Sequence, residues 1–235
     1  MSKNNKKKQL EESGVKTFLK KVASAPIRRK NGSVGRLIFA MDATASRQPT
    51  WDQAAHIQTE MFLATSRLGG LDVQLAFFRG FGEFKVSQWT NSGAQLLSLM
   101  RTVHCSAGET QIGKVLQHAI NQTKHTKLNA LVYVGDSMEE DIDKLGKKAG
   151  ELGLYGVPAF MFQEGKDYIT NYAYKEIAKL SGGACVSFDS GSVEILRELL
   201  TAVAVYAAGG RSELEKMADR QGGEIKKLTQ QIGKS

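Results

Sequence analysis

From about residue 35 onward, short apolar segments alternate with longer amphipathic ones. Four continuous apolar runs are typical of buried parallel strands: LIFAM (37–41), NALVYVGD (129–136), VPAFMF (157–162) and ACVSF (184–188). Between the first two runs, LDVQLAFF and EFKVSQW alternate apolar and polar positions on either side of RGFG, which is typical of an antiparallel hairpin. The pattern therefore predicts six strands.

The segments between these strands carry helix signals. Thr50 and Gln53 have the spacing of a capping box, and the apolar stripe that follows predicts a helix as far as Gly69-Gly70. Ser137 opens a second capping box, which predicts a helix that runs to about Leu152. Further helices are predicted over 94–103, 110–124, 168–180 and 193–207.

This order of elements predicts an α/β fold. Right-handed crossovers would give a Rossmann-like three-layer αβα sandwich, whose six-stranded sheet is mostly parallel with one antiparallel edge strand. In such folds, ligands bind outside the carboxyl ends of the strands, at the point where the strand order reverses. Asp42 and Asp136 each follow a predicted strand and are expected at this edge.

Charge and composition divide the chain into three parts. Residues 1–34 hold ten Lys or Arg against two Glu, which accounts for the whole net charge of +8. We expect a basic, flexible arm over 1–34, the α/β domain over 35–210, and a polar tail over 211–235 that forms a short helix or stays disordered. A basic arm is usually solvated, although contact with nucleic acid, an anionic membrane or an acidic partner stays open.

Several features predict a cytoplasmic protein. No apolar segment follows the basic N-terminus, so a secretory signal is not expected, and the most apolar stretch (199–210) is too short to cross a bilayer. Cys105 and Cys185 lie far apart without metal-ligand spacing, which is typical of reduced, buried thiols.

Five residues near the predicted strand ends offer oxygen ligands. They are Asp42, Thr44 and Ser46 after the first strand, Thr110 at the start of a helix, and Asp136 after the fourth strand. The first three alternate in sequence, so an extended loop can turn their side chains the same way. A set with oxygen and neither nitrogen nor sulfur suits a hard cation such as Mg²⁺. Alternatively, these residues are ordinary loop and cap residues.

These motifs resemble the metal-ion-dependent adhesion site (MIDAS) of von Willebrand factor type A (VWA) domains. DATAS (42–46), the Thr of GET and the Asp of VGD match its three motifs in order, and the resemblance covers about 35–210. Thr44 stands where the family usually has Ser, and Ser137 where many members have Gly.

The resemblance implies the VWA fold and a Mg²⁺ or Mn²⁺ ion held by Asp42, Thr44, Ser46, Thr110 and Asp136. It also implies an open coordination position that an Asp or Glu of a partner protein fills. Intracellular members of the family often serve as adaptor or assembly subunits beside ATPases or chaperones, so the resemblance implies such a role and such a partner.

Three residues after the first motif, Arg47, Gln48 and Trp51, are candidates for the rim that contacts this partner. A basic residue beside the metal would suit an acidic partner, and an exposed Trp would suit an interface anchor. The alternative for Trp51 is packing at the start of the predicted helix.

The alternative function is a Mg²⁺-dependent phosphohydrolase, because VGDSMEEDI also resembles haloacid-dehalogenase-like phosphatases. In that family a second acid transfers protons, whereas Thr44 occupies its place here. The acids of 139–143 also suit the positive end of a helix dipole. The sequence lacks the P-loop, HExxH and GxSxG motifs, so we expect a binding module rather than an enzyme.

Overall fold

The computed structural model describes residues 17, 21–22, 34–49, 51–52, 54, 65, 70–189 and 193–221. Its strands are β1 (Gly35–Asp42), β2 (Leu71–Arg79), β3 (Glu83–Val86), β4 (Ala130–Gly135), β5 (Ala159–Glu164) and β6 (Ala184–Phe188). They form one sheet in the order β3-β2-β1-β4-β5-β6. Only the β2–β3 pair is antiparallel among these strands, so the predicted sheet with one antiparallel edge strand is confirmed.

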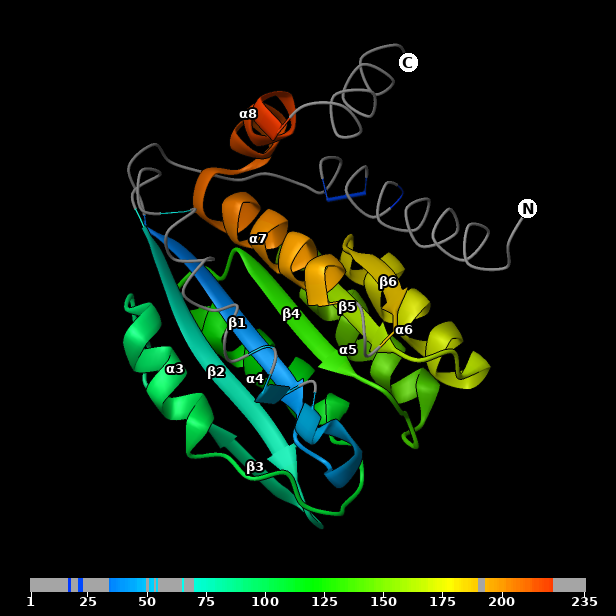
Figure 1. Ribbon diagram of the computed structural model, residues 1–235. Helices are drawn as coiled ribbons and strands as arrows, with labels where there is room; N and C mark the ends of the chain where they lie inside the picture. Colours follow the sequence, from blue (N-terminus) through cyan, green and yellow to red (C-terminus); the bar gives the residue numbers. More distant parts are fainter. Residues whose placement is uncertain are drawn as a thin grey trace, which may run out of the picture.

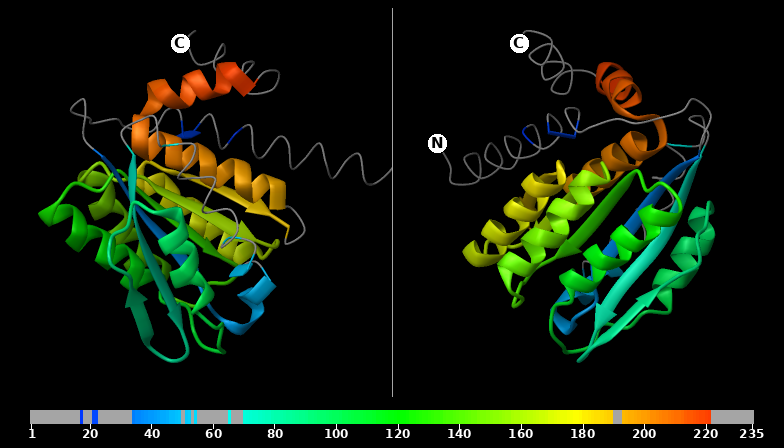
Figure 2. Two further views of the ribbon diagram at one scale, coloured as in Figure 1. Left: turned by 60° about the vertical axis from the view of Figure 1, so that its left-hand side comes forward. Right: turned by 180° about the vertical axis from the view of Figure 1, so that it is seen from behind.

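Helices cover both faces of this sheet. They are α3 (Gly93–Arg101), α4 (Ile112–His125), α5 (Ile142–Leu154), α6 (Tyr168–Ser181), α7 (Val193–Gly209) and α8 (Arg211–Gln221). Figure 1 shows α3 and α7 in front of the sheet, and the right-hand view of Figure 2, seen from behind, shows α4, α5 and α6 on the opposite face. The three-layer sandwich predicted from the sequence is therefore confirmed.

Each face of the sheet has its own apolar core, because side chains alternate along a strand. Leu37, Phe39 and Met41 of β1 join the cluster under α3 and α7, which also includes Leu214 of α8. Ile38 and Ala40 join the cluster under α4, α5 and α6. Among the described residues, no helix is both long and apolar enough to cross a membrane.

Two predicted features need separate comment. The helix predicted over 50–68 lies outside the described residues except at positions 51, 52, 54 and 65, as do most of the arm and the tail beyond 221.

Cys105 and Cys185 are free thiols, and burial raises their pKa values to about 11 and about 12.

The predicted start of the helix after β4 is wrong. The helix begins at Ile142 rather than at Ser137, and its N-cap is Asp141, whose carboxylate accepts hydrogen bonds from the amides of Asp143 and Lys144. Ser137 instead donates its hydroxyl to Oε1 of Glu139 at 2.6 Å. The capping-box spacing failed because Glu140, three residues after Ser137, does not turn back to the amide of Ser137 but accepts the amides of Ile112 and Gly113 in a different segment of the chain.

Candidate metal site

The two predicted acids lie at the carboxyl ends of neighbouring strands. β1 pairs with β2 on one side and with β4 on the other, so the strand order reverses between β1 and β4. Met41 is in register with Val134, which places Asp42 and the segment that begins at Asp136 at the same edge of the sheet. This is the position at which open α/β sheets bind ligands.

Asp42 is a buried carboxylate with one occupied and one free oxygen. Its exposed fraction is 0%, and its Oδ1 accepts a hydrogen bond of 2.7 Å from the amide of Thr44. Its Oδ2 has no hydrogen-bond partner among the described residues. Burial raises the pKa of Asp42 to about 6, although the bonds from Thr44 lower it; nearby Asp136 raises it further, and Arg47 lowers it.

Ser46 connects the two acidic loops. Its hydroxyl donates to Oδ2 of Asp136 at 2.7 Å, while Oδ1 of Asp136 is buried and has no hydrogen-bond partner in the described part of the chain. Two carboxylate oxygens, one from each loop, are thus buried without a donor. Because native proteins rarely leave such atoms unsatisfied, the arrangement fits a bound cation.

Thr110 approaches this edge from the loop before α4. Its side chain is buried, and its Oγ1 accepts a hydrogen bond of 3.2 Å from the amide of Glu139. Its own amide donates to Oε2 of Glu139 at 2.9 Å. The structure therefore brings together Asp42, Ser46 and Asp136, with Thr44 bonded to the first, and it fastens Thr110 to the chain just beyond Asp136.

The donor set, which consists of oxygen atoms alone, matches the preferences of hard cations such as Mg²⁺ and Mn²⁺. Among the described residues, no group of three or more His, Cys, Asp or Glu side chains is placed to hold a metal. The predicted set has only two carboxylates and completes itself with hydroxyls, which suits Mg²⁺ because that ion is usually held by one or two carboxylates and keeps several waters. Asp42, Ser46 and Asp136 would hold it, and the hydroxyls of Thr44 and Thr110 are the further predicted ligands.

Arg47 does not lie on the rim, which corrects the expectation for this residue. Its side chain is completely buried and forms an ion pair with Glu164 at the end of β5. The pair bridges the loop after β1 and the carboxyl end of β5. No local sequence signal indicates it, because the partner lies more than a hundred residues away.

Trp51 is likewise inside the protein, so the prediction that it lies on the rim is wrong and the alternative, packing inside the protein, is confirmed. Its exposed fraction is 1%, its indole Nε1 donates to the carbonyl of Met100 at 2.9 Å, and its ring meets that of Phe77 edge-on. Gln48 is half-buried, and its Oε1 accepts a hydrogen bond of 3.1 Å from the amide of Cys105. Its contact with a partner stays a prediction.

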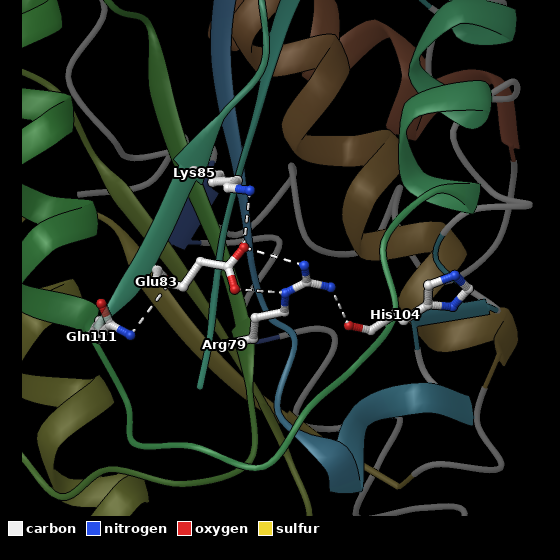
Figure 3. Close-up of polar contacts among 5 residues, drawn as sticks. All are labelled: Arg79, Glu83, Lys85, His104 and Gln111. Carbon is white, nitrogen blue, oxygen red and sulfur yellow. Dashed lines mark hydrogen bonds and ion pairs between the residues drawn. The ribbon is translucent and has the colours of Figure 1, made fainter. Parts of the chain in front are cut away.

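The hairpin of β2 and β3 holds the loop that carries Thr110. Arg79 pairs with Glu83 through two hydrogen bonds and donates from Nη1 to the carbonyl of His104 at 2.7 Å (Figure 3). Gln111 donates to the carbonyl of Glu83 at 3.4 Å, and Lys85 forms an ion pair with the same Glu83 side chain. The sequence placed Arg79 in a turn but gave no partner for it.

Comparison with known proteins supports the fold but not a closer relationship. No protein-family model matches the sequence, and no curated protein does either. Solved structures do match: the SpRpn10 VWA domain has a TM-score of 0.56 and 15% identity over 72% of this chain and 94% of that one. A von Willebrand factor type A protein from Catenulispora acidiphila has a TM-score of 0.58 and 17% identity over 74% of this chain and 43% of that one.

A third match is proximal thread matrix protein 1 of the mussel byssus, whose structure has a zinc-occupied MIDAS motif. Its TM-score is 0.58, with 12% identity over 74% of this chain and 47% of that one. A metal thus occupies a MIDAS motif in that protein. At these identities the likeness establishes the architecture alone: the chain has the fold of von Willebrand factor type A domains.

Proposed function

We propose that this protein is a VWA-type protein-binding module that recognises an acidic residue of a partner through a divalent cation. The cation is Mg²⁺ or Mn²⁺, and the protein acts in the cytoplasm as an adaptor or assembly factor rather than as an enzyme. The solved structures it resembles include a coat protein, a pilus adhesin and a matrix protein, which agrees with a non-enzymatic role.

The observation that carries this proposal is the pair of donor-free carboxylate oxygens, Oδ2 of Asp42 and Oδ1 of Asp136. They are buried at the edge where the strand order reverses, and the Ser46 hydroxyl bridges the two loops that carry them. An ionised carboxylate without a partner is expensive to bury, so the site as folded favours a positive charge beside it.

The residues of the site would have different roles in holding the cation. Asp42 and Asp136 supply the negative charge, and the hydroxyls of Thr44, Ser46 and Thr110 add neutral ligands that leave the cation electron-poor. The hydrogen bond that the Thr44 amide donates to Asp42 fixes the orientation of that carboxylate. A bound divalent cation supplies a Lewis-acidic position that accepts a carboxylate oxygen of the partner.

The identity of the partner rests on the resemblance alone. VWA domains inside cells often accompany ATPases or chaperones, so we propose a partner of this kind. Nucleic-acid binding through the arm over 1–34 is the less favoured alternative. Deleting residues 1–30 tests it, because a phosphate-binding arm makes affinity strongly salt-dependent.

A pull-down from native lysate tests the proposal. Wild type, Asp42→Ala and the control Asp143→Ala, which changes an exposed acid of α5, are each incubated with Mg²⁺ or with EDTA. We expect one protein to be retained by wild type and by the control with Mg²⁺ only. Equal retention by Asp42→Ala, or retention in EDTA, would refute cation-dependent recognition.

The phosphohydrolase alternative is not favoured. Glu139 and Glu140, which that reading would place around Mg²⁺, direct their carboxylates to backbone amides at the start of α4. Thr44, in the position of the proton-transferring acid, hydrogen-bonds to Asp42 instead. We expect no Mg²⁺-dependent hydrolysis of p-nitrophenyl phosphate by the wild type.

A further inference from the structure

Two acids beyond Asp136 turn away from the helix that follows them. Glu139 and Glu140 precede α5, yet their carboxylates accept hydrogen bonds from the start of α4, almost thirty residues earlier. The Glu139 carboxylate accepts a hydrogen bond of 2.9 Å from the amide of Thr110. The Glu140 carboxylate accepts hydrogen bonds from the amides of Ile112 and Gly113, the second at 2.9 Å.

These bonds satisfy the amides that the first turn of α4 leaves without helical partners. The N-cap residue, Gln111, makes no side-chain cap, although its carbonyl accepts the amides of Lys114 and Val115. An α-helix leaves four N-terminal amides unpaired, and a carboxylate at this end also interacts favourably with the helix dipole. Glu140 therefore acts as a cap that comes from a different segment of the chain.

The Thr110 hydroxyl takes part in the same contact. Its oxygen accepts the amide of Glu139 at 3.2 Å, and the Thr110 amide donates to the carboxylate of the same Glu139 at 2.9 Å. A hydroxyl oxygen has two acceptor lone pairs. One is used by Glu139, so these bonds decide the direction in which the second points.

The other end of the contact is fixed as well. The Ser137 hydroxyl donates to Oε1 of Glu139 at 2.6 Å, and the Ser137 carbonyl accepts a hydrogen bond of 3.0 Å from the buried Tyr174 of α6. Ser137 directly follows Asp136. The loop of the second acid, the start of α4 and the body of α6 are thus joined by one continuous set of hydrogen bonds.

We infer that Glu139 and Glu140 are positioning residues of the cation site, which hold the Thr110 hydroxyl in a fixed relation to Asp136. This inference rests on the proposed function, because it assumes a cation between those two residues. The acids do not touch the cation themselves. Their effect is to keep a neutral ligand from the loop before α4 in place, so their loss lowers affinity for the cation.

A double-mutant cycle in the full chain tests the inference, with Mn²⁺ as the probe and free Mn²⁺ measured by electron paramagnetic resonance. Glu140→Gln keeps the shape but replaces one acceptor oxygen with an amide donor, and Thr110→Val removes the hydroxyl. Loss of a group that orients a metal ligand typically lowers affinity by about 10- to 100-fold. We expect each single variant to fall in this range, and the double variant to fall little further, because both changes remove the same contribution.

The control is Asp141→Ala, which removes the N-cap of α5 but no bond to α4. It weakens the start of α5 and should leave Mn²⁺ affinity unchanged. Hydrogen exchange should quicken at the amides of Ile112 and Gly113 in Glu140→Gln and not in the control.

Three outcomes would overturn the inference. If Glu140→Gln binds Mn²⁺ as well as Asp141→Ala does, or if the effects of Glu140→Gln and Thr110→Val add, then Glu140 does not act through Thr110. In both cases the wild type still binds Mn²⁺, so the proposed function survives. If the wild type binds no Mn²⁺, the proposed function fails and the positioning role fails with it.

Discussion

Replacing Asp42 with Asn should stabilise the cation-free protein at neutral pH. The carboxylate is completely buried, and its Oδ2 has no hydrogen-bond partner among the described residues. Burial is the largest reason that its pKa rises to about 6, and the nearby Asp136 raises it further. At neutral pH the folded protein must therefore keep this group charged in a place that disfavours the charge. Asn is isosteric, is neutral, and can still accept the Thr44 amide.

The magnitude follows from the difference between the folded and ordinary pKa values. A change from 3.8 to about 6 corresponds to about 3 kcal/mol of unfolding free energy once the pH is well above both values. The sign is fixed by proton binding: between these values the folded state holds the proton that the unfolded state releases. The contribution of Asp42 to stability therefore falls as the pH rises from about 4 to about 6, and then stays constant.

Urea denaturation in EDTA at about pH 4 and about pH 7.5 measures this effect. Relative to wild type, Asp42→Asn should gain up to about 3 kcal/mol between the two pH values. Asp143→Asn, at an exposed position of α5, should gain little. Added Mn²⁺ at about 100 times its dissociation constant should stabilise wild type by about 2.7 kcal/mol and should not stabilise Asp42→Asn.

Two results would refute this reasoning. If Asp42→Asn shows the same pH dependence as wild type, then burial does not hold the Asp42 proton in the folded state. If Mn²⁺ stabilises both proteins equally, the cation binds elsewhere. Either result can be read without knowledge of the partner, because unfolding is the only observable.

Three further substitutions test the surroundings of the site. Ser46→Ala removes the hydrogen bond to Asp136, and it should lower Mn²⁺ affinity about tenfold or more while changing the unfolding free energy by less than about 1 kcal/mol. Arg47→Met leaves the charge of Glu164 without its buried guanidinium, so urea denaturation should show a loss of about 3 kcal/mol or more. Gly108→Ala places a methyl group 2.2 Å from a hairpin carbonyl oxygen, and it should cost about 1–3 kcal/mol and weaken Mn²⁺ binding.

Two of these substitutions have a control, and each of the three has an outcome that would contradict it. Adding Glu164→Gln to Arg47→Met should return part of the lost stability, and no recovery would mean that the loss comes from packing rather than from charge. Gly150→Ala in α5 has open space around the added methyl and should stabilise by about 0.5–1 kcal/mol. If Gly108→Ala is as stable as Gly150→Ala, the hairpin backbone near Gly108 can shift to accommodate the added methyl group without a cost in stability. Unchanged Mn²⁺ affinity in Ser46→Ala would remove Ser46 from the site.

The sequence by itself determined the architecture. Continuous apolar runs and alternating ones distinguish buried parallel strands from the edge hairpin, and the handedness of crossovers leaves few ways to order them. Asp42 and Asp136 follow two such strands, so their meeting at the reversal point of the sheet could be predicted from local pattern and topology.

Only the tertiary structure decided which polar side chains lie inside and which segments they join. Nothing local distinguishes Arg47 from an exposed basic residue, because its burial depends on Glu164 at the end of a distant strand. Glu140 has the capping-box spacing with Ser137, yet its carboxylate accepts the amides of Ile112 and Gly113 at the start of α4 instead. The physical reason is shared: a charged side chain takes the partner that folding brings near, and sequence spacing records only the partners that are local.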